Sequence, residues 1–286
     1  MTGIILAAID NSPSCSSVLA HAALCAAEVD GQVCAVYVNA SAAPDLELPS
    51  WKGAGVYVVD GNPVERLLRI ASHPAVTAVV IGRGGAPGAS APGDVCRALA
   101  SRLAKPLLIV PPEVSRTPAF TRVLIPLEGT VETTTPIAAF LRALAPGHGR
   151  ETILLHVFTP ENLPPFADHE PHESNAWVQE FLTRFAPPAD HRRRMTMRVG
   201  RLEDVGRVAD EVHADVIAVA WSQDLAEGRA RVISALLEHS TRPVLLVPMD
   251  YRGGADTNAC IVTARSTARG RGDATSDDSY CPAAVL

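Results

Sequence analysis

A glycine-rich stretch between an apolar run and a helix-like segment holds the residues best suited to bind a ligand. The apolar residues 76–81 lead into three glycines, Gly82, Gly84 and Gly85. Glycine lets backbone N–H groups approach a ligand closely, and the N-terminal end of a following helix attracts anions. The stretch predicts either a cradle for phosphate oxygens or a surface loop without a ligand, because the glycines alone fit both.

An aspartate, Asp94, follows Gly93 at the point where the helix is expected to begin. Aspartate is a strong helix N-cap, and its carboxylate accepts hydrogen bonds from the same N–H groups that a phosphate would use. Two like charges about 4 Å apart repel by roughly 4 kcal/mol at an effective dielectric constant of about 20. A magnesium ion between carboxylate and phosphate oxygens would reverse that effect. Asp94 is therefore either a cap alone or a cap that tolerates or assists a bound phosphate.

The composition argues against several classes of protein. The 286 residues carry a formal net charge of −6 with no dominant basic block, so nucleic acid is not the expected partner. The six cysteines form no C-x-x-C pair, and no serine elbow or readable Cys/His pair supports nucleophilic catalysis. No apolar run reaches the roughly 20 residues that span a bilayer. We expect a cytoplasmic protein that is not an enzyme and does not bind membranes.

Residues 168–174 resemble the zinc-protease motif H-E-x-x-H only superficially. Glu173 stands where the second histidine belongs, and Pro171 opposes a helix there. We therefore expect no metal site. His156 follows an apolar strand and is expected to be an ordinary core or strand-end residue.

A tandem duplication organises the chain. Three blocks recur in the same order, so that residues 4–9 match 123–127, residues 56–82 match 196–220, and residues 103–111 match 240–248. A proline-rich, polar seam at residues 112–121 separates the two repeats. We predict domains at residues 1–112 and 121–250, followed by a tail, 251–286, whose composition is typical of disorder.

Each repeat alternates short Val/Ile/Leu-rich runs with helical patterns, which predicts an α/β fold with a parallel sheet covered on both faces. The first helix is expected to begin at Ser12-Pro13, a capping serine before a proline. A helical pattern at Glu173–Phe185 in the second repeat has no counterpart in the first. The strands expected in the first repeat are Ile4–Ile9, Val33–Val38, Val56–Val59, Val76–Ile81 and Leu107–Val110.

These features together resemble the universal stress protein family in its two-domain form, over about Thr2 to Asp250. The resemblance rests on the tandem units and on three turns, Asp10–Ser12, Gly61–Pro63 and Gly82–Gly85. It implies two five-stranded, Rossmann-like sheets of strand order 3-2-1-4-5 that pair as an internal pseudo-dimer. In many members it also implies ATP or another adenine nucleotide between strands 1 and 4, and a regulatory rather than a catalytic role.

Nucleotide-binding members of that family carry the pattern G-x2-G-x9-G-S/T. Gly82 and Gly85 fit its first part, and Gly93-Asp94 fits its last pair if the loop is two residues shorter. Val95 then stays in register with the following helix. A carboxylate thus replaces the hydroxyl that binds phosphate in the family.

The resemblance also implies roles for two residues outside the glycine loop. It places Asp10 at the adenine or ribose edge and Val38 in the wall of the adenine pocket. Asp10 fits equally well as a turn residue ahead of Ser12, and Val38 as an ordinary core valine. Both pairs of interpretations stay open.

The second repeat departs further from the family pattern. Ala220 and Gln223 stand in place of the two glycines, so we expect no nucleotide there. Glu128 occupies the position that corresponds to Asp10, and Arg231 begins the helix. We predict that their charged groups approach to within about 4 Å across the vacant crevice.

Two functions from different classes follow from the sequence. In the first, the chain is a stress-response regulator that binds ATP or another adenine nucleotide in its N-terminal domain only, with or without magnesium. In the second, both sites are degenerate and the chain is a nucleotide-independent protein-interaction module. No readable motif identifies the protein partner, or any dimerisation beyond the internal pair.

Overall fold

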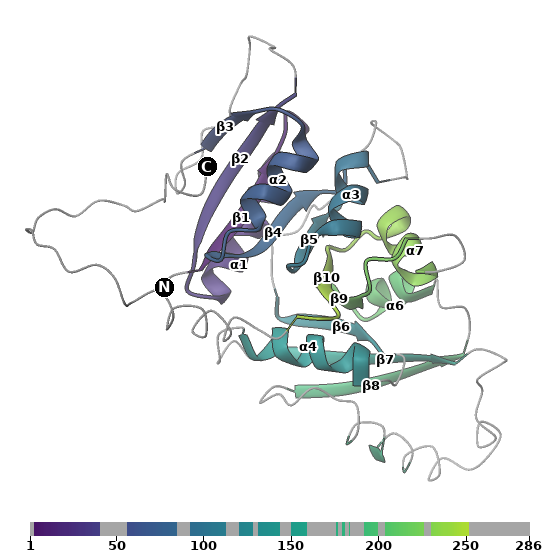
Figure 1. Ribbon diagram of the computed structural model, residues 1–286. Helices are drawn as coiled ribbons and strands as arrows, with labels where there is room; N and C mark the ends of the chain where they lie inside the picture. Colours follow the sequence, from purple (N-terminus) through teal and green to yellow (C-terminus); the bar gives the residue numbers. More distant parts are fainter. Residues whose placement is uncertain are drawn as a thin grey trace, which may run out of the picture.

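The computed structural model describes residues 3–40, 56–84, 92–112, 120–127, 131–143, 150–158, 192–199, 204–225 and 230–251, together with residues 176, 179, 180 and 183. Within these residues, ten strands form one sheet with helices on both faces, and Figure 1 shows it running from β3 at one edge to β8 at the other. We call the elements up to residue 112 the first half and those from residue 120 the second half.

The two halves repeat the same kinds of element. The first half contains β1 (Ile4–Ile9), α1 (Cys15–Glu28), β2 (Gln32–Asn39), β3 (Val56–Asp60), α2 (Pro63–Ala71), β4 (Val76–Gly82), α3 (Asp94–Arg102) and β5 (Leu107–Val110). The second half contains β6 (Arg122–Pro126), α4 (Val131–Ala143), β7 (Glu151–Phe158), β8 (Arg192–Val199), α6 (Val205–Glu211), β9 (Val216–Trp221), α7 (Arg231–His239) and β10 (Val244–Pro248).

The strand order of the sheet is β3-β2-β1-β4-β5-β10-β9-β6-β7-β8. Neighbouring strands are parallel within each half. The halves join through β5 and β10, which pair antiparallel with Leu108 opposite Leu245. The predicted α/β class is therefore confirmed, and the structure adds that the two sets of five strands share one continuous sheet. The predicted domain boundaries stay a prediction.

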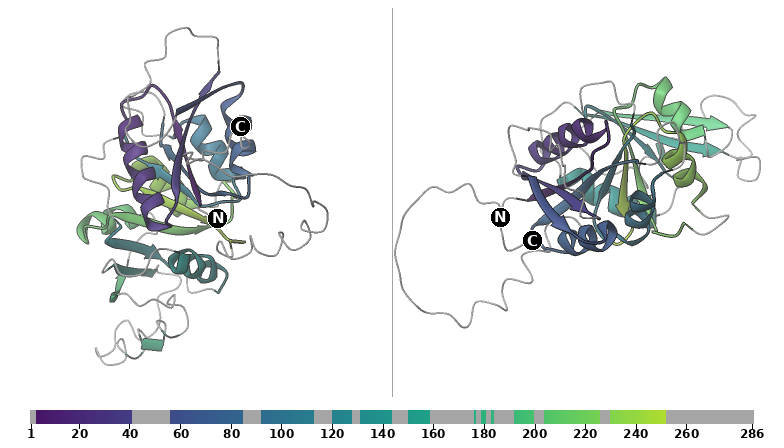
Figure 2. Two further views of the ribbon diagram at one scale, coloured as in Figure 1. Left: turned by 90° about the vertical axis from the view of Figure 1, so that its left-hand side faces the viewer. Right: turned by 90° about the horizontal axis from the view of Figure 1, so that it is seen from above.

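Both faces of the sheet are buried, which explains the continuous apolar runs of its strands. All six residues of β1 are buried, and they alternate between two hydrophobic clusters. Ile4 and Leu6 pack on the side of α2, α3, α6 and α7, whereas Ile5 and Ala7 pack on the side of α1 and α4. Figure 2 shows α1 and α2 on opposite sides of the sheet.

The structure bears out most of the expected elements of the first half. The strands at Ile4–Ile9 and Leu107–Val110 have the expected bounds, and the other three extend by one or two residues. The expected start of the first helix is wrong, because α1 begins at Cys15 and Ser12 lies in the preceding turn, where its carbonyl accepts a hydrogen bond from the Cys15 N–H. In the range 173–185, the described residues 176, 179, 180 and 183 are all helical.

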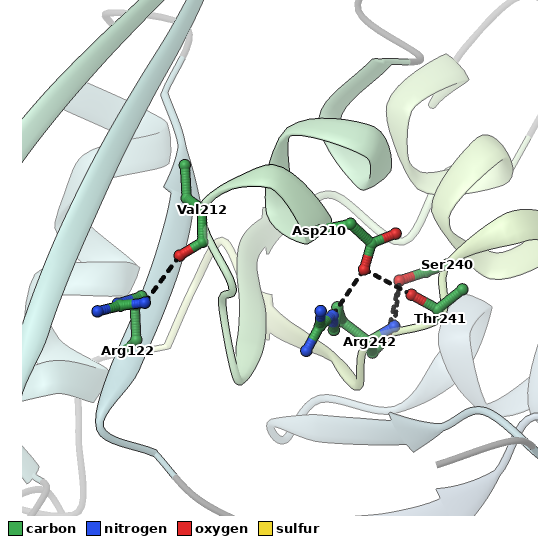
Figure 3. A network of polar contacts seen from close by, with 6 residues as sticks. All are labelled: Arg122, Asp210, Val212, Ser240, Thr241 and Arg242. Atoms are coloured by element: carbon green, nitrogen blue, oxygen red, sulfur yellow. Dashed lines mark hydrogen bonds and ion pairs between the residues drawn. The ribbon is translucent and has the colours of Figure 1, made fainter. Parts of the chain in front are cut away.

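A polar network fixes the end of α7 against α6 in the second half (Figure 3). The Asp210 carboxylate accepts hydrogen bonds from Thr241 Oγ1 at 2.8 Å and from Arg242 Nε at 2.7 Å. The Ser240 hydroxyl donates to the Arg242 carbonyl and accepts from the Arg242 N–H. Side chains of the second half therefore hold the backbone that follows α7 in place.

A buried ion pair links α1 of the first half to the start of β7 in the second. Arg150 Nη2 lies 2.5 Å from Glu28 Oε2, and their side chains are only 1% and 6% exposed. Arg150 Nε also donates to the Phe120 carbonyl at 2.9 Å. Removing one partner of a buried pair takes away the nearest opposite charge from the other, so this contact contributes to the stability of the packing between the two halves.

We predict that Arg150→Met lowers the free energy of unfolding by about 3–5 kcal/mol, because the Glu28 carboxylate stays buried without its arginine. Urea unfolding measures the loss. The double variant Glu28→Gln/Arg150→Met should be more stable than Arg150→Met alone. The control is Arg207→Met, whose side chain is 60% exposed beside Glu211 and should contribute at most about 1 kcal/mol. Equal losses for Arg150→Met and Arg207→Met would contradict the prediction.

Lys105 lies at the end of the sheet opposite the carboxyl ends of β1 and β4. Its Nζ donates to the His73 carbonyl at 2.6 Å and to the Val76 carbonyl. Burial lowers the pKa of Lys105 to about 8, because the charged amine loses water. The folded chain therefore releases this proton at a lower pH than the unfolded chain does.

The shift predicts a rise in stability at alkaline pH. Below pH 8 the amine is charged in both states and the cost of burying it is present in full. Between pH 8 and the ordinary lysine pKa of about 10.4, the unfolded chain binds more protons, so this group makes the free energy of unfolding rise with pH. Unfolding of the unaltered chain and of Lys105→Met from pH 7 to pH 10 measures the difference. A difference that does not change with pH would contradict the assignment.

Candidate functional site

A cavity of about 240 Å³ opens at the carboxyl ends of β1, β2 and β4, beside the N-terminal ends of α2 and α3. In parallel sheets, ligands bind beyond these ends at the point where the strand order reverses, which here lies between β1 and β4. The described residues that line the cavity are Ala8, Ile9, Asp10, Val36, Val38, Pro63, Leu67, Ile81, Gly82, Arg83, Gly84, Gly93, Asp94, Val95 and Cys96.

Six of the seven residues predicted as a binding site line this one cavity. They are Asp10, Val38, Gly82, Gly93, Asp94 and Val95. The seventh, Gly85, lies outside the described residues. The structure thus brings together residues from three separate segments, although their role as ligand contacts stays a prediction.

The inner wall of the cavity is apolar. Val36, Leu67 and Ile81 are buried members of the cluster between the sheet and α2, and the partly buried Val38 packs against the same cluster. Such a wall suits a flat, weakly polar ring, whereas the polar groups lie at the ends of β1 and β4.

Asp10 shapes the turn that follows β1. Its Oδ1 accepts hydrogen bonds from the Ser12 N–H at 3.0 Å and from Ser12 Oγ at 2.5 Å, and Ser12 Oγ lies 2.7 Å from Ser14 Oγ. The carboxylate therefore has the turn role, and it also lines the cavity. Both interpretations of Asp10 fit the same position.

The expectation that Asp94 caps α3 is wrong. The N-cap is Gly93, whose backbone is extended at φ −63° and ψ 158°, and Asp94 is the first helical residue. Among the described residues, no side chain caps this end of α3, and the Gly93 N–H donates to the Arg83 carbonyl at 3.0 Å. The start of α3 thus lines the cavity with no side-chain cap from the described residues, and the exposed Asp94 carboxylate stands there.

Gly82 and Gly84 have separate structural reasons to be glycine. A Cβ on Gly82 would lie 3.0 Å from Ser14 Oγ, so glycine lets β4 end close to α1. Gly84 has φ +65°, a left-handed conformation that side chains other than Asn and Asp rarely adopt. The glycines shape the loop whether or not a ligand binds.

Sequence reasoning missed Arg83 and Cys96. Arg83 lies between Gly82 and Gly84 in the sequence, and this position could have indicated that it belongs to the site. It is the one cation among the described residues that line the cavity. Burial raises the pKa of the Cys96 thiol to about 12, so the thiol stays protonated and is not a nucleophile. Cys96 is part of the wall.

The second half uses the corresponding loop to contact the first half. Gln223, which replaces the second glycine, has φ +66°, and its Nε2 donates to the Leu103 carbonyl at 2.5 Å. Trp221 Nε1 donates to the Ala100 carbonyl at 2.5 Å. Arg231 begins α7, but Glu128 lies outside the described residues, so their predicted approach stays a prediction.

The other candidate sites form no second centre among the residues that the structure describes. His156 Nδ1 lies 2.8 Å from the Leu127 carbonyl, as expected for a strand-end residue. Residues 168–174 lie outside the described part of the chain. Among the residues with described side chains, no three His, Cys, Asp or Glu gather as a metal ion would need, and no described helix is both long and apolar enough to cross a bilayer.

Comparison with known proteins shows the fold. No protein-family model and no curated protein matches the chain significantly. A universal stress protein of Archaeoglobus fulgidus is similar in structure, with a TM-score of 0.61 and 14% identity over 87% of this chain and 98% of its own. A protein of unknown function from Pseudomonas aeruginosa also has a TM-score of 0.61, with 8% identity over 86% of this chain and 92% of its own. The chain therefore has the fold of the tandem-length universal stress proteins.

Some solved universal stress proteins carry a nucleotide. One from Arabidopsis thaliana was solved with AMP bound, and it is 19% identical over 45% of this chain and 91% of its own. Its TM-score of 0.28 is too low to transfer that ligand to this chain.

The loop geometry predicts that Gly84→Ala lowers the free energy of unfolding by roughly 1–2 kcal/mol, because a Cβ is strained at φ +65°. Gly84→Asn is the matched variant and should lose less, since asparagine tolerates the left-handed region. Urea unfolding of both variants measures the difference. Equal stability of Gly84→Ala and the unaltered chain would show that the loop adopts another conformation.

Proposed function

We propose that the cavity of the first half binds an adenine nucleotide and that the chain is a stress-response regulator rather than an enzyme. One observation carries the proposal. The cavity lies where the strand order reverses, and the N-terminal end of α3, which no described side chain caps, lines it. Backbone N–H groups at such an end attract phosphate oxygens.

The shape of the cavity supports a ligand with an apolar ring and an anionic tail. Val36, Val38 and Leu67 offer a surface for the ring, and Gly82 and Gly84 keep side chains away from the tail. The choice of adenine, and of ATP in particular, comes from the resemblance to universal stress proteins. In this proposal the site belongs to the first half alone, because Trp221 and Gln223 engage the corresponding loop of the second half in contacts with α3.

A magnesium ion fits the residues at the mouth of the cavity. Asp94 is an exposed carboxylate at the start of α3, and magnesium binds through one or two carboxylates together with phosphate oxygens. Asp94 would hold the ion, and Asp10 is less available because Ser12 engages its Oδ1. The ion would neutralise the charge of the nucleotide beside the carboxylate. Without it, Asp94 repels a phosphate from the N–H groups of α3.

A regulatory role suits the chemistry of the described cavity residues. The carboxylates among them are Asp10, which is engaged in its turn, and Asp94, and the Cys96 thiol stays protonated. None of these groups is set up as a nucleophile or as a base for a bound water. We propose that the bound nucleotide changes the surface offered to a protein partner.

The alternative is an interaction module that binds no nucleotide. It is favoured by the charges at the cavity mouth, where Asp10 and Asp94 line the space and the Arg83 guanidinium instead contacts carbonyls of the second half. In that case the chain would act through its surfaces alone.

The first test is to purify the chain under native conditions, denature it and identify any released nucleotide by mass spectrometry. Calorimetry with ATP, in the presence and absence of magnesium, then measures affinity. We predict that Asp94→Asn strengthens binding of magnesium-free ATP about tenfold or more, because it removes like-charge repulsion at the phosphate end. With magnesium the gain should shrink or reverse.

The matched control is Asp30→Asn, which removes an exposed carboxylate at the opposite end of the sheet and should leave the affinity unchanged. A chain that binds ATP in neither the unaltered nor the Asp94→Asn form would refute the nucleotide site and support the interaction module.

A further inference from the structure

Arg83 connects the cavity to the second half. Its backbone is fixed in the cavity wall, because its N–H donates to the Val110 carbonyl at 2.7 Å and its carbonyl accepts from the Gly93 N–H at 3.0 Å. Its side chain leaves the cavity and also lines a narrow space between β5, α7 and β10. The residue thus belongs both to the candidate site and to the contact between the halves.

The Arg83 guanidinium binds the C-terminal end of α7. Nη1 donates to the Glu238 carbonyl at 3.1 Å and to the Ser240 carbonyl at 3.2 Å. The last carbonyls of a helix carry partial negative charge, so a cation is favourable there. Ser240 is itself held by Arg242, which pairs with Asp210 of α6, as Figure 3 shows. The backbone that supplies the two carbonyl acceptors of Arg83 is therefore held in a fixed position.

A second contact runs in the opposite direction. Trp221, the last residue of β9, and Gln223, in the loop that follows, donate to the carbonyls of Ala100 and Leu103 at the C-terminal end of α3. Trp221 is 4% exposed and Ala100 is 2% exposed, so this contact is dry. The N-terminal end of the same helix lines the cavity through Gly93 and Asp94. In each half, residues at or just after the end of the fourth strand therefore donate hydrogen bonds to the C-terminal end of a helix in the other half.

We propose that the second half sets the ligand affinity of the first cavity through these two contacts, with Arg83 as a positioning residue. The inference rests on the proposed nucleotide site. A ligand that binds between the loop after β4 and the start of α3 needs both at fixed positions, and fixing them in advance lowers the entropic cost of binding. By thermodynamic reciprocity, a bound ligand must in turn stabilise the contacts at the end of α7.

Three variants of the full chain test the proposal, with magnesium-ATP as the probe and calorimetry as the readout. Arg83→Met keeps the side-chain stem but removes the guanidinium, and Trp221→Phe keeps a ring but removes the donor. We expect Arg83→Met to weaken binding about tenfold and Trp221→Phe a few-fold, because each loosens one wall of the cavity. Arg69→Met is the control. It removes an exposed cation from the last turn of α2, away from the cavity lining, and should change affinity less than about twofold.

Hydrogen exchange separates positioning from direct contact with the ligand. The Ser240 N–H donates to the Leu236 carbonyl at 3.0 Å and closes the last turn of α7. Magnesium-ATP should slow exchange at residues 236–242 in the unaltered chain and in Arg69→Met. In Arg83→Met at saturating ATP, this slowing should disappear. A residue that only touched the ligand would leave it in place.

The outcomes distinguish this inference from the proposed site. Suppose that magnesium-ATP binds but does not change hydrogen exchange at residues 236–242, or that Arg83→Met and Trp221→Phe both bind it with unchanged affinity. Either result would overturn the coupling and leave the proposed site intact. Failure of the unaltered chain and of Asp94→Asn to bind the probe would overturn both proposals together.

Discussion

The short antiparallel pairing of β5 with β10 is the constraint on which the rest of the structure depends. Leu107, Leu108 and Ile109 pair with three residues of β10, and this junction turns two sets of parallel strands into one sheet. Because the pairing relates the halves by an approximate twofold rotation, α3 and α7 come to lie on the same face of the sheet. The loop after the fourth strand of each half then meets the end of a helix from the other.

This arrangement gives a physical reason for the difference between the two crevices. A loop that cradles a ligand needs small residues and free N–H groups, whereas a loop that docks onto another half needs side chains that reach. The first half keeps Gly82 and Gly84, and among the described residues of its loop the Arg83 side chain contacts the second half. The second half carries Trp221 and Gln223, and both are used in docking. The first crevice thus holds an open cavity, whereas the corresponding residues of the second half form contacts between the halves.

The parts of this fold that could be predicted from sequence are those set by local burial. Strands such as β1 are apolar throughout because both faces of the sheet are covered, so their ends are visible in the sequence. The start of α3 was misplaced because Gly93 and Asp94 are both good caps, and the choice depends on the bond from the Gly93 N–H to the Arg83 carbonyl across the loop. The contact of Arg83 with Glu238 spans 155 residues of sequence, which no local pattern can indicate.

The buried ion pair of Glu28 and Arg150 has a consequence for the order in which the chain folds during its synthesis. The two residues are 122 positions apart, and the ribosome releases the N-terminal partner first. A nascent first half therefore exposes a carboxylate-bearing face of α1 whose arginine has not yet been synthesised. Final consolidation of this region has to wait until the start of β7 has emerged and docked. The ion pair therefore forms only after residue 150 has been synthesised, and nascent chains that stop earlier lack this contact between α1 and the second half.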